Sequence, residues 1–425
     1  MDCLGTVDTS KPTSNKCFGI ENNLLCTCSE DCLALDIIRP STATNKSHLP
    51  VFVFLHGGEF IGGDKSDIDG TNFVINAQIM GAPFIFVAVN YRLSFLGFPG
   101  GVETGKVGRH NIGLKDLRFA LQWVKQNIQD FGGQASGADA TTCQLIAYGG
   151  TLEPPFRAMI LDCGAATGLT PIPYPTYTTW QQHYDDILRL TNCAPTPGRS
   201  CIKCLQDLPI DTLAAAFYQV FLKSHSIPHH VYAPVIDGDF LRAYPSVLME
   251  NSQLASVPTF IGHTTDELID RVPSNVNFNS SDSALGFASA FLSYVPKKTL
   301  VDMLEIYPPG EFADEGPLGS GLQWSRIVAV DNDLQTSSST LDDVTLARSY
   351  QHYMSSFLTY LDPNTLVSPN SPPEVRWEPF TRDTQTRLVF SGTSQSGHSN
   401  IHWEQDLKDN RRCDYIEAHN QDFLR

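Results

Sequence analysis

Charged residues are scarce in this chain of 425 residues: they make up 18% of it, whereas average domains carry about 25%. Positive charge is scarcer still, because 29 lysines and arginines face 46 acidic residues and leave a net charge of −17. The chain has no basic run, and therefore lacks the electrostatic footprint of proteins that bind nucleic acid or anionic membranes. Apolar runs are short as well, and none approaches the roughly 18–20 residues of a membrane span. These absences exclude nucleic acid as a partner and predict no transmembrane segment.

The remaining composition is that of a globular protein. Hydrophobic residues make up 41% of the chain and aromatic residues 10%, which is ample material for a core. Glycine and proline number 31 and 27, close to average usage, so collagen-like and low-complexity classes are excluded. We find no internal repeat and no linker, and expect a single domain over residues 1–425.

Eleven cysteines are many for a reducing compartment, and their odd number leaves at least one thiol outside any intramolecular pair. They lie at Cys3, Cys17, Cys26, Cys28 and Cys32, at Cys193, Cys201 and Cys204, and singly at Cys143, Cys163 and Cys413. The C-x-x-C formed by Cys201 and Cys204 leaves a zinc site open, but no second ligand pair follows at finger spacing. Short disulfide-closed loops fit the pattern better and indicate an oxidising compartment.

Secretion is the localisation that these cysteines favour. Two N-x-[ST] sequons, at Asn45 and Asn279, agree with it. The first residues have neither the charged nor the apolar region of a signal peptide. We therefore expect an extracellular protein whose true N-terminus precedes this sequence.

Apolar runs and helical periodicities alternate along the chain. Val51–Leu55 and Phe84–Asn90 are continuous, partly β-branched runs of the kind that parallel strands buried on both faces require. Further strands are predicted at Leu33–Ile38, Phe156–Leu161, Thr259–Gly262 and Arg387–Phe390. Helices are predicted at Asn111–Phe131, Tyr174–Leu190, Asp211–Leu222 and Leu346–Leu361. This alternation predicts an α/β fold with a mostly parallel sheet.

Four stretches in the first third of the chain resemble those of a known family. They are Ser29-Glu-Asp-Cys-Leu-Ala-Leu-Asp, Val53-Phe-Leu-His-Gly-Gly-Glu-Phe, Val89-Asn-Tyr-Arg-Leu-Ser-Phe-Leu-Gly-Phe, and the run from Asn111-Ile-Gly-Leu-Lys-Asp to Asp130-Phe-Gly-Gly. In this order they resemble the type-B carboxylesterases, the family of cholinesterases and fungal lipases. Weaker likeness continues at 156–164, 234–241 and 261–267, and Gln144–Gly150 is most similar to fungal members. The resemblance implies an α/β-hydrolase fold, with helices on both faces of a mostly parallel central sheet.

Ester hydrolysis in this family needs a serine nucleophile, a histidine that activates it, an acid that orients the histidine, and backbone N–H groups for the oxyanion. The resemblance gives the oxyanion role to the N–H groups of Gly58 and Glu59. Glu59 stands where many members have glycine or alanine, so its carboxylate must point away from the oxyanion. The other interpretation of this segment is a tight glycine turn after a buried strand. The acid would be Glu267, which could equally be a carboxylate at a helix start.

The nucleophile and the histidine are missing from their expected places. The chain contains no G-x-S-x-G, the strained turn that exposes the nucleophile in this fold. Ser136 is the only candidate in register, displaced by one position, and it would serve better as the cap of a helix over Ala138–Tyr148. The segment that bears the family's histidine is absent too. His398 and His402 form H-x-x-x-H, which we interpret as surface histidines, not as a metal site.

The absence of the G-x-S-x-G turn and of the histidine segment implies an incomplete carboxylesterase domain. In such a domain some strands of the central sheet are missing. The resemblance also implies disulfides between Cys193 and Cys204 and between Cys17 and Cys32. We expect a carboxylic-ester hydrolase by descent, an esterase or lipase that acts on a small-molecule ester through a serine acyl-enzyme, needs no cofactor or metal, and is inactive as written. A non-catalytic cholinesterase-like binding or adhesion protein and a truncated gene product are the alternatives. The oligomeric state is left open.

Overall fold

The structure is a computed structural model. It describes residues 29–133, 142–151, 153–162, 172–173, 178–223, 231–262, 281–291, 295–306, 341–366, 375–381, 384, 386–391, 400–405, 415 and 418–419. Among these residues no helix is both long enough and apolar enough to cross a membrane.

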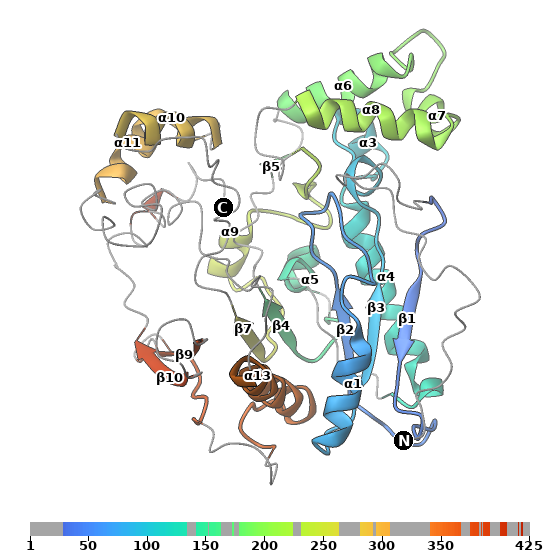
Figure 1. Cartoon of the computed structure of the whole chain (residues 1–425). Helices are drawn as coiled ribbons and strands as arrows, with labels where there is room; N and C mark the ends of the chain where they lie inside the picture. Colours follow the sequence, from blue (N-terminus) through green and yellow to red (C-terminus); the bar gives the residue numbers. More distant parts are fainter. Residues whose placement is uncertain are drawn as a thin grey trace.

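The first part of the central sheet has three strands. They are β1 (Leu35–Ile38), β2 (Val51–Leu55) and β3 (Ile85–Val89), and their order is β1-β3-β2 (Figure 1). β3 pairs with β2 in parallel and with β1 antiparallel. All five residues of β3 are buried, as their continuous apolar sequence predicts for a strand covered on both faces.

The second part of the sheet joins β4 (Met159–Asp162) and β7 (Thr259–Gly262) in parallel, with Ile160 opposite Phe260. On each side of the sheet, residues of the two parts pack into the same hydrophobic core. Val51 and Val53 of β2 belong to one core with Met159 and Leu161 of β4. Phe52 lies in a second core with Ile160 and Phe260. The two parts therefore form one layer, and no described strand pairs with the facing edges of β2 and β4.

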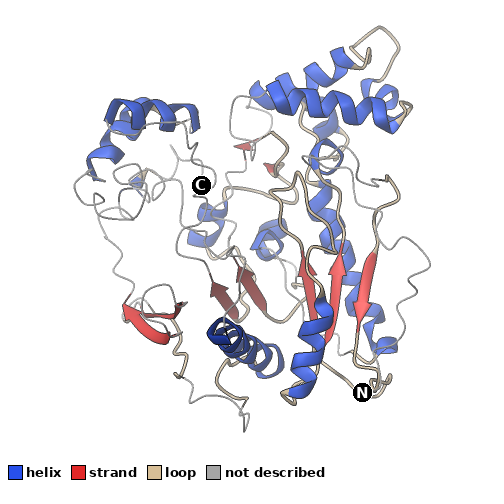
Figure 2. Ribbon diagram, viewed as in Figure 1, coloured by secondary structure: helices blue, strands red, loops and turns tan. Residues whose placement is uncertain are grey.

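Helices cover both faces of this layer (Figure 2). On one face lie α4 (Ile112–Asn127), its continuation η1 (Ile128–Phe131) and α5 (Thr142–Ile146). On the other lie α1 (Gly70–Ile79) and α13 (Leu341–Tyr360). α4 directs Leu117, Leu121 and Val124 into the core, as its periodicity predicts. The expected α/β-hydrolase architecture, a mostly parallel sheet between helices, is confirmed.

The remaining elements surround this layer. They are the short α2 (Ser94–Gly97), α3 (Val102–Lys106), η2 (Ala147–Gly150) and α9 (Pro245–Glu250), the helices α6 (Thr178–Leu190), α7 (Cys201–Gln206), α8 (Ile210–Lys223), α10 (Ser281–Phe291) and α11 (Lys297–Ile306), the parallel pair β5 (Ile172–Pro173) and β6 (Val235–Ile236), and the antiparallel hairpin β9 (Thr386–Ser391) and β10 (Asn400–Gln405). In Figure 1, α6, α7 and α8 form a separate layer beyond the upper ends of β2 and β3.

Candidate active site and its polar support

The loop that follows the carboxyl end of β2 is sharply turned. Gly58, Glu59 and Phe60 all have positive φ angles, of 101°, 58° and 65°. Left-handed backbone costs a non-glycine residue on the order of 1–3 kcal/mol, and it persists only where surrounding contacts hold it. Two such residues in succession mark this loop as a segment whose shape is imposed by its neighbours.

Two groups of contacts impose that shape. Within the loop, the carbonyl oxygen of Gly58 accepts hydrogen bonds from the N–H groups of Ile61 and Gly62, both at 3.0 Å. From outside, the N–H of Ser94 donates to the carbonyl oxygen of Phe60 at 2.7 Å. The Ser94 hydroxyl donates to the carbonyl oxygen of Ile61 at 3.2 Å. Because Ser94 is fully buried, it fixes the loop from the core side.

His56 anchors the start of the loop. The hydroxyl of Tyr91 donates to the carbonyl oxygen of His56 at 3.1 Å, and the two rings stack with their centroids 4.5 Å apart. Burial raises the pKa of Tyr91, and the nearby Asp67 raises it further. Tyr91 is therefore a neutral phenol at any physiological pH and a permanent donor to the loop.

Two glycines in this loop leave no room for a side chain. A Cβ at Gly58 would stand 2.7 Å from the carbonyl carbon of Gly62, and one at Gly63 would stand 2.5 Å from the carbonyl oxygen of Gly57. A Cβ at Gly57 would meet nothing within 4 Å. The loop thus requires glycine at 58 and 63 but not at 57.

A bidentate ion pair connects the motif at 89–98, which contains Arg92 and Ser94, to α4. The Nε of Arg92 donates to Asp116 at 2.7 Å, and the backbone N–H of Arg92 reaches the same carboxylate oxygen at 3.2 Å. Asp116 is almost buried, with 9% of its side chain exposed, while 39% of Arg92 is exposed. The pair therefore holds the segment that carries Ser94 against the sheet-covering helix.

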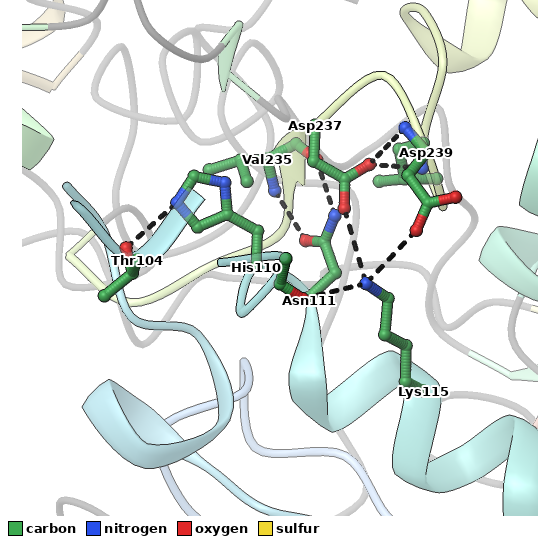
Figure 3. A network of polar contacts seen from close by, with 9 residues as sticks. Thr104, His110, Asn111, Lys115, Val235, Asp237 and Asp239 are labelled. Atoms are coloured by element: carbon green, nitrogen blue, oxygen red, sulfur yellow. Dashed lines mark hydrogen bonds and ion pairs between the residues drawn. The ribbon is translucent and has the colours of Figure 1, made fainter. Parts of the chain in front are cut away.

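Asn111 links the start of α4 to β6, as Figure 3 shows. Its side-chain amide donates to the carbonyl oxygen of Val235 at 2.8 Å and accepts from the Val235 N–H at 2.9 Å. Next to it, Lys115 lies 3.4 Å from Asp239 and 4.0 Å from Asp237. These contacts join two of the motifs that carry the family resemblance.

A buried histidine extends this network on the other side. The Nε2 of His110 lies 3.1 Å from the Thr104 hydroxyl (Figure 3). It also lies 3.1 Å from the carbonyl oxygen of Gly101. Burial lowers the pKa of His110 and Lys115 adds to the effect, while the Gly101 carbonyl and Asp237 oppose it. His110 is therefore a neutral structural histidine at physiological pH.

The edge of β2 that faces β4 receives the chain as it leaves η1. The N–H of Leu49 donates to the carbonyl oxygen of Gly132 at 2.8 Å, and Leu49 forms a parallel bridge with Gly133. The next residue, Pro50, bonds to Ile85 of β3 on the opposite side. Gly133 thus stands where a strand beside β2 would begin. Ser136, the displaced nucleophile candidate, lies in 134–141, outside the described residues.

The other sequence-predicted residues are placed as follows. Glu267 lies beyond the described residues, five positions after the end of β7. Cys193 and Cys204, the pair that the resemblance implies, form a disulfide with their Cα atoms 5.6 Å apart. Cys32 is disulfide-bonded, and Cys17 lies outside the described residues.

The histidine pattern near the C-terminus is placed in part. His402 is a half-buried residue of β10, while His398 lies outside the described residues. Glu404 of the same strand bonds to Arg387 of β9 at 3.0 Å. No group of three histidine, cysteine or acidic side chains in the described part of the chain could hold a metal ion.

The site described above lies at the carboxyl end of β2 in an α/β-hydrolase layer, and comparison with known proteins identifies the class. The model of the carboxylesterase family matches residues 2–304, and the chain belongs to this family. Secreted lipase 1 of Botryotinia fuckeliana is 32% identical over 327 residues, which cover 72% of this chain and 56% of that protein. Lipase 1 of Geotrichum candidum is 29% identical over 331 residues, 72% of this chain and 58% of that protein.

A solved structure agrees on the fold. The crystal structure of Aspergillus niger EstA superimposes with a TM-score of 0.77 at 20% identity, covering 97% of this chain and 88% of that one. The chain spans a little over half the length of the two lipases.

Proposed function

We propose that this chain descends from a secreted carboxylic-ester hydrolase, an esterase or lipase for small-molecule esters, and that the chain as written is inactive. The proposal treats residues 1–425 as one incomplete domain. Extracellular localisation is supported by relatives that are named secreted lipases and by the Cys193–Cys204 disulfide.

The oxyanion loop is the part of the catalytic machinery that the proposal retains. Successive backbone N–H groups in a turn can point toward one side and form a concavity suited to an anion. Gly58 and Glu59 lie in such a turn at the carboxyl end of β2; the Gly58 carbonyl is bonded within the loop, and Ser94 holds the adjacent Phe60 from the core side. Their N–H groups would stabilise the negative oxygen of a tetrahedral intermediate.

One observation supports the claim of inactivity: among the described residues, no strand pairs with the facing edges of β2 and β4, where the strand before the nucleophile belongs. The G-x-S-x-G turn joins a buried strand to a helix, and here only eight residues separate Gly133 from α5. Residues 134–141, QASGADAT, contain no valine, isoleucine, leucine or aromatic residue. A central strand between β2 and β4 needs such residues on both faces. The sequence of this segment therefore predicts neither the strand nor the turn.

The remaining groups cannot replace the nucleophile. Glu267, the proposed acid, would have no histidine to orient. Removing triad members from a serine hydrolase leaves a rate of about 10³–10⁴ over water, supplied by the oxyanion hole and substrate binding. The sequence before Ser136 predicts no strand that would strain its turn and expose its hydroxyl.

Hydrolysis of short-chain p-nitrophenyl esters tests this proposal. We expect the purified chain to match its Ser136→Ala variant, with a fungal lipase as the positive control. Hydrolysis well above that of the variant would refute inactivity. Transcript reads across the codons of Gly133 and Gln134 test why the nucleophile segment is missing. Reads that encode an additional strand and a G-x-S-x-G turn between these residues would identify the active form of the enzyme.

A second candidate, a non-catalytic binding protein, is favoured by the intact support of the loop. The Asn111–Val235 pair and the Ser94 contacts persist in a chain without G-x-S-x-G. Cooperative unfolding and a monodisperse secreted product would support a binding role. Insoluble or non-cooperative material would identify a truncated product instead.

A further inference from the structure

An exposed turn between β1 and β2 carries the sequon Asn45-Lys46-Ser47. The N–H of Ser47 donates to the carbonyl oxygen of Thr44 at 2.9 Å, which closes a four-residue turn with Asn45 and Lys46 at its centre. Both central residues are exposed. Within the described part of the chain, the bonds of this turn involve Thr44, Lys46 and Ser47, and the carboxamide of Asn45 takes no part in them.

The backbone of this turn is held by several hydrogen bonds, while Asn45 is exposed to solvent. The N–H of Thr44 donates to the Ser47 hydroxyl at 2.8 Å, and the N–H of Lys46 reaches the Thr44 hydroxyl at 3.3 Å. Arg39 holds the residue that precedes the turn: its guanidinium donates to the carbonyl oxygen of Ala43 at 3.1 Å and to that of Phe131 at 2.9 Å. None of these contacts would be disturbed by a group attached to the Asn45 amide.

The turn also lies away from the candidate active site. It precedes β2, whereas the oxyanion loop follows β2, so the two stand at opposite ends of the same strand. On its inner side the turn packs against the end of η1, where a Cβ at Gly132 would meet the carbonyl oxygen of Thr44. A large substituent on Asn45 would therefore extend into solvent at the amino end of β2 and leave the oxyanion loop uncovered.

We propose that Asn45 is an N-glycosylation site. In the secretory pathway the Asn45 amide nitrogen would attack C1 of an oligosaccharide carried on a polyprenyl diphosphate. A nitrogen–C1 bond forms, the bond from C1 to the phosphate oxygen breaks, the amide loses one proton and the polyprenyl diphosphate leaves. The proposal rests on the extracellular route proposed above and is independent of catalysis.

The test uses the full chain, produced behind a cleavable secretion leader in a eukaryotic host. The Asn279→Gln background removes the second sequon, which lies outside the described residues. In that background we expect peptide N-glycosidase to shift the electrophoretic mobility, and mass spectrometry to find the Asn45 peptide converted to Asp. Adding Asn45→Gln or Ser47→Ala should abolish the shift, and adding Ser47→Thr, which preserves the sequon, should retain it.

Secreted and retained protein are both digested, because the glycan is attached before folding is complete and a folding defect therefore cannot hide the modification. A glycan on the Asn45 peptide in either pool supports the proposal. An Asn45 peptide found only unmodified in both pools overturns it. Ester hydrolysis is not a readout here, so this result is independent of whether the chain is an active enzyme.

Discussion

The side chain of Asn111 pairs with both backbone polar groups of Val235, a residue 124 positions further along the chain. The amide therefore gives β6, which already pairs with β5, a second partner at this residue. Asn111 itself has a φ of 52°, in the left-handed region that asparagine tolerates better than most residues. The pair joins the motif at the start of α4 to the motif at 234–241, and so accounts for two separate stretches of the family resemblance.

Asn111→Ala should be strongly destabilising. Both backbone groups of Val235 would lose their partners in a buried setting, at about 1–3 kcal/mol for each group. Chemical denaturation should therefore show a loss of roughly 2–5 kcal/mol. The matched control is Asn251→Ala, which removes the exposed bond from Asn251 to the carbonyl oxygen of Val247 and should cost under about 0.5 kcal/mol. Equal effects of the two substitutions would contradict this account of the pair.

The two glycines at the start of the loop that follows β2 should respond differently to alanine. Gly58→Ala adds a Cβ that overlaps the Gly62 carbonyl and forces a left-handed residue, so we expect destabilisation of about 1–3 kcal/mol or more. Gly57→Ala meets open space and should change the free energy of unfolding by under about 1 kcal/mol. Thermal unfolding of the two variants measures the difference. A loop that tolerates both changes would not have the conformation described here.

The disulfide between Cys193 and Cys204 should contribute measurably to stability. It closes a loop with a sequence separation of 11, for which chain entropy predicts about 2–4 kcal/mol. The Cys193→Ala/Cys204→Ala double variant should lose this amount in urea denaturation. Cys201→Ala is the control, since Cys201 is a free, buried thiol beside the bond and its removal leaves the loop closed. A larger loss in the control would assign the stabilisation to packing around α7.

Stability should fall as the solution becomes mildly acidic, in part because of His110. Its folded-state pKa is lowered by burial, so below about pH 6.5 the unfolded chain binds a proton that the folded chain does not. The free energy of unfolding should therefore decrease as pH falls through 6.5, until the pH reaches the folded-state pKa of His110.

His110→Gln should flatten this pH dependence. His183, whose pKa is also lowered mainly by burial, should account for part of the slope that remains. The measurement is urea denaturation between about pH 5 and 8. An unchanged slope in His110→Gln would show that the pKa of His110 is the same in the folded and unfolded chains, and would contradict this account.

The strands of the central layer are the part of the fold that local sequence predicts well. β2 begins and ends at the predicted residues, and β3 lies within the predicted run, because a strand buried on both faces must be continuously apolar. The sequence analysis predicts no strand at β10: its sequence NIHWEQ is polar and includes His402, which we interpret from the sequence as a surface histidine. Pairing with β9, including the Arg387–Glu404 ion pair, makes this polar segment a strand.

The candidate site could be predicted only where a motif marks it. Gly58 and Glu59 were named from their motif, but the left-handed backbone of Phe60 and the support by Ser94 depend on contacts between distant segments. The short helices α2, α3 and α5 have four or five residues, too few to show a helical period. The positions of these short helices depend on tertiary packing, which a single sequence does not reveal.

Labelling by a fluorophosphonate probe tests the central claim most directly, because the probe reacts only with an activated serine. The purified chain should remain unlabelled under conditions in which a fungal lipase is labelled completely, and Ser136→Ala should not change the result. Stoichiometric labelling at Ser136, abolished by Ser136→Ala, would contradict the account. It would mean that a displaced triad forms, with His263 or a C-terminal histidine as its base.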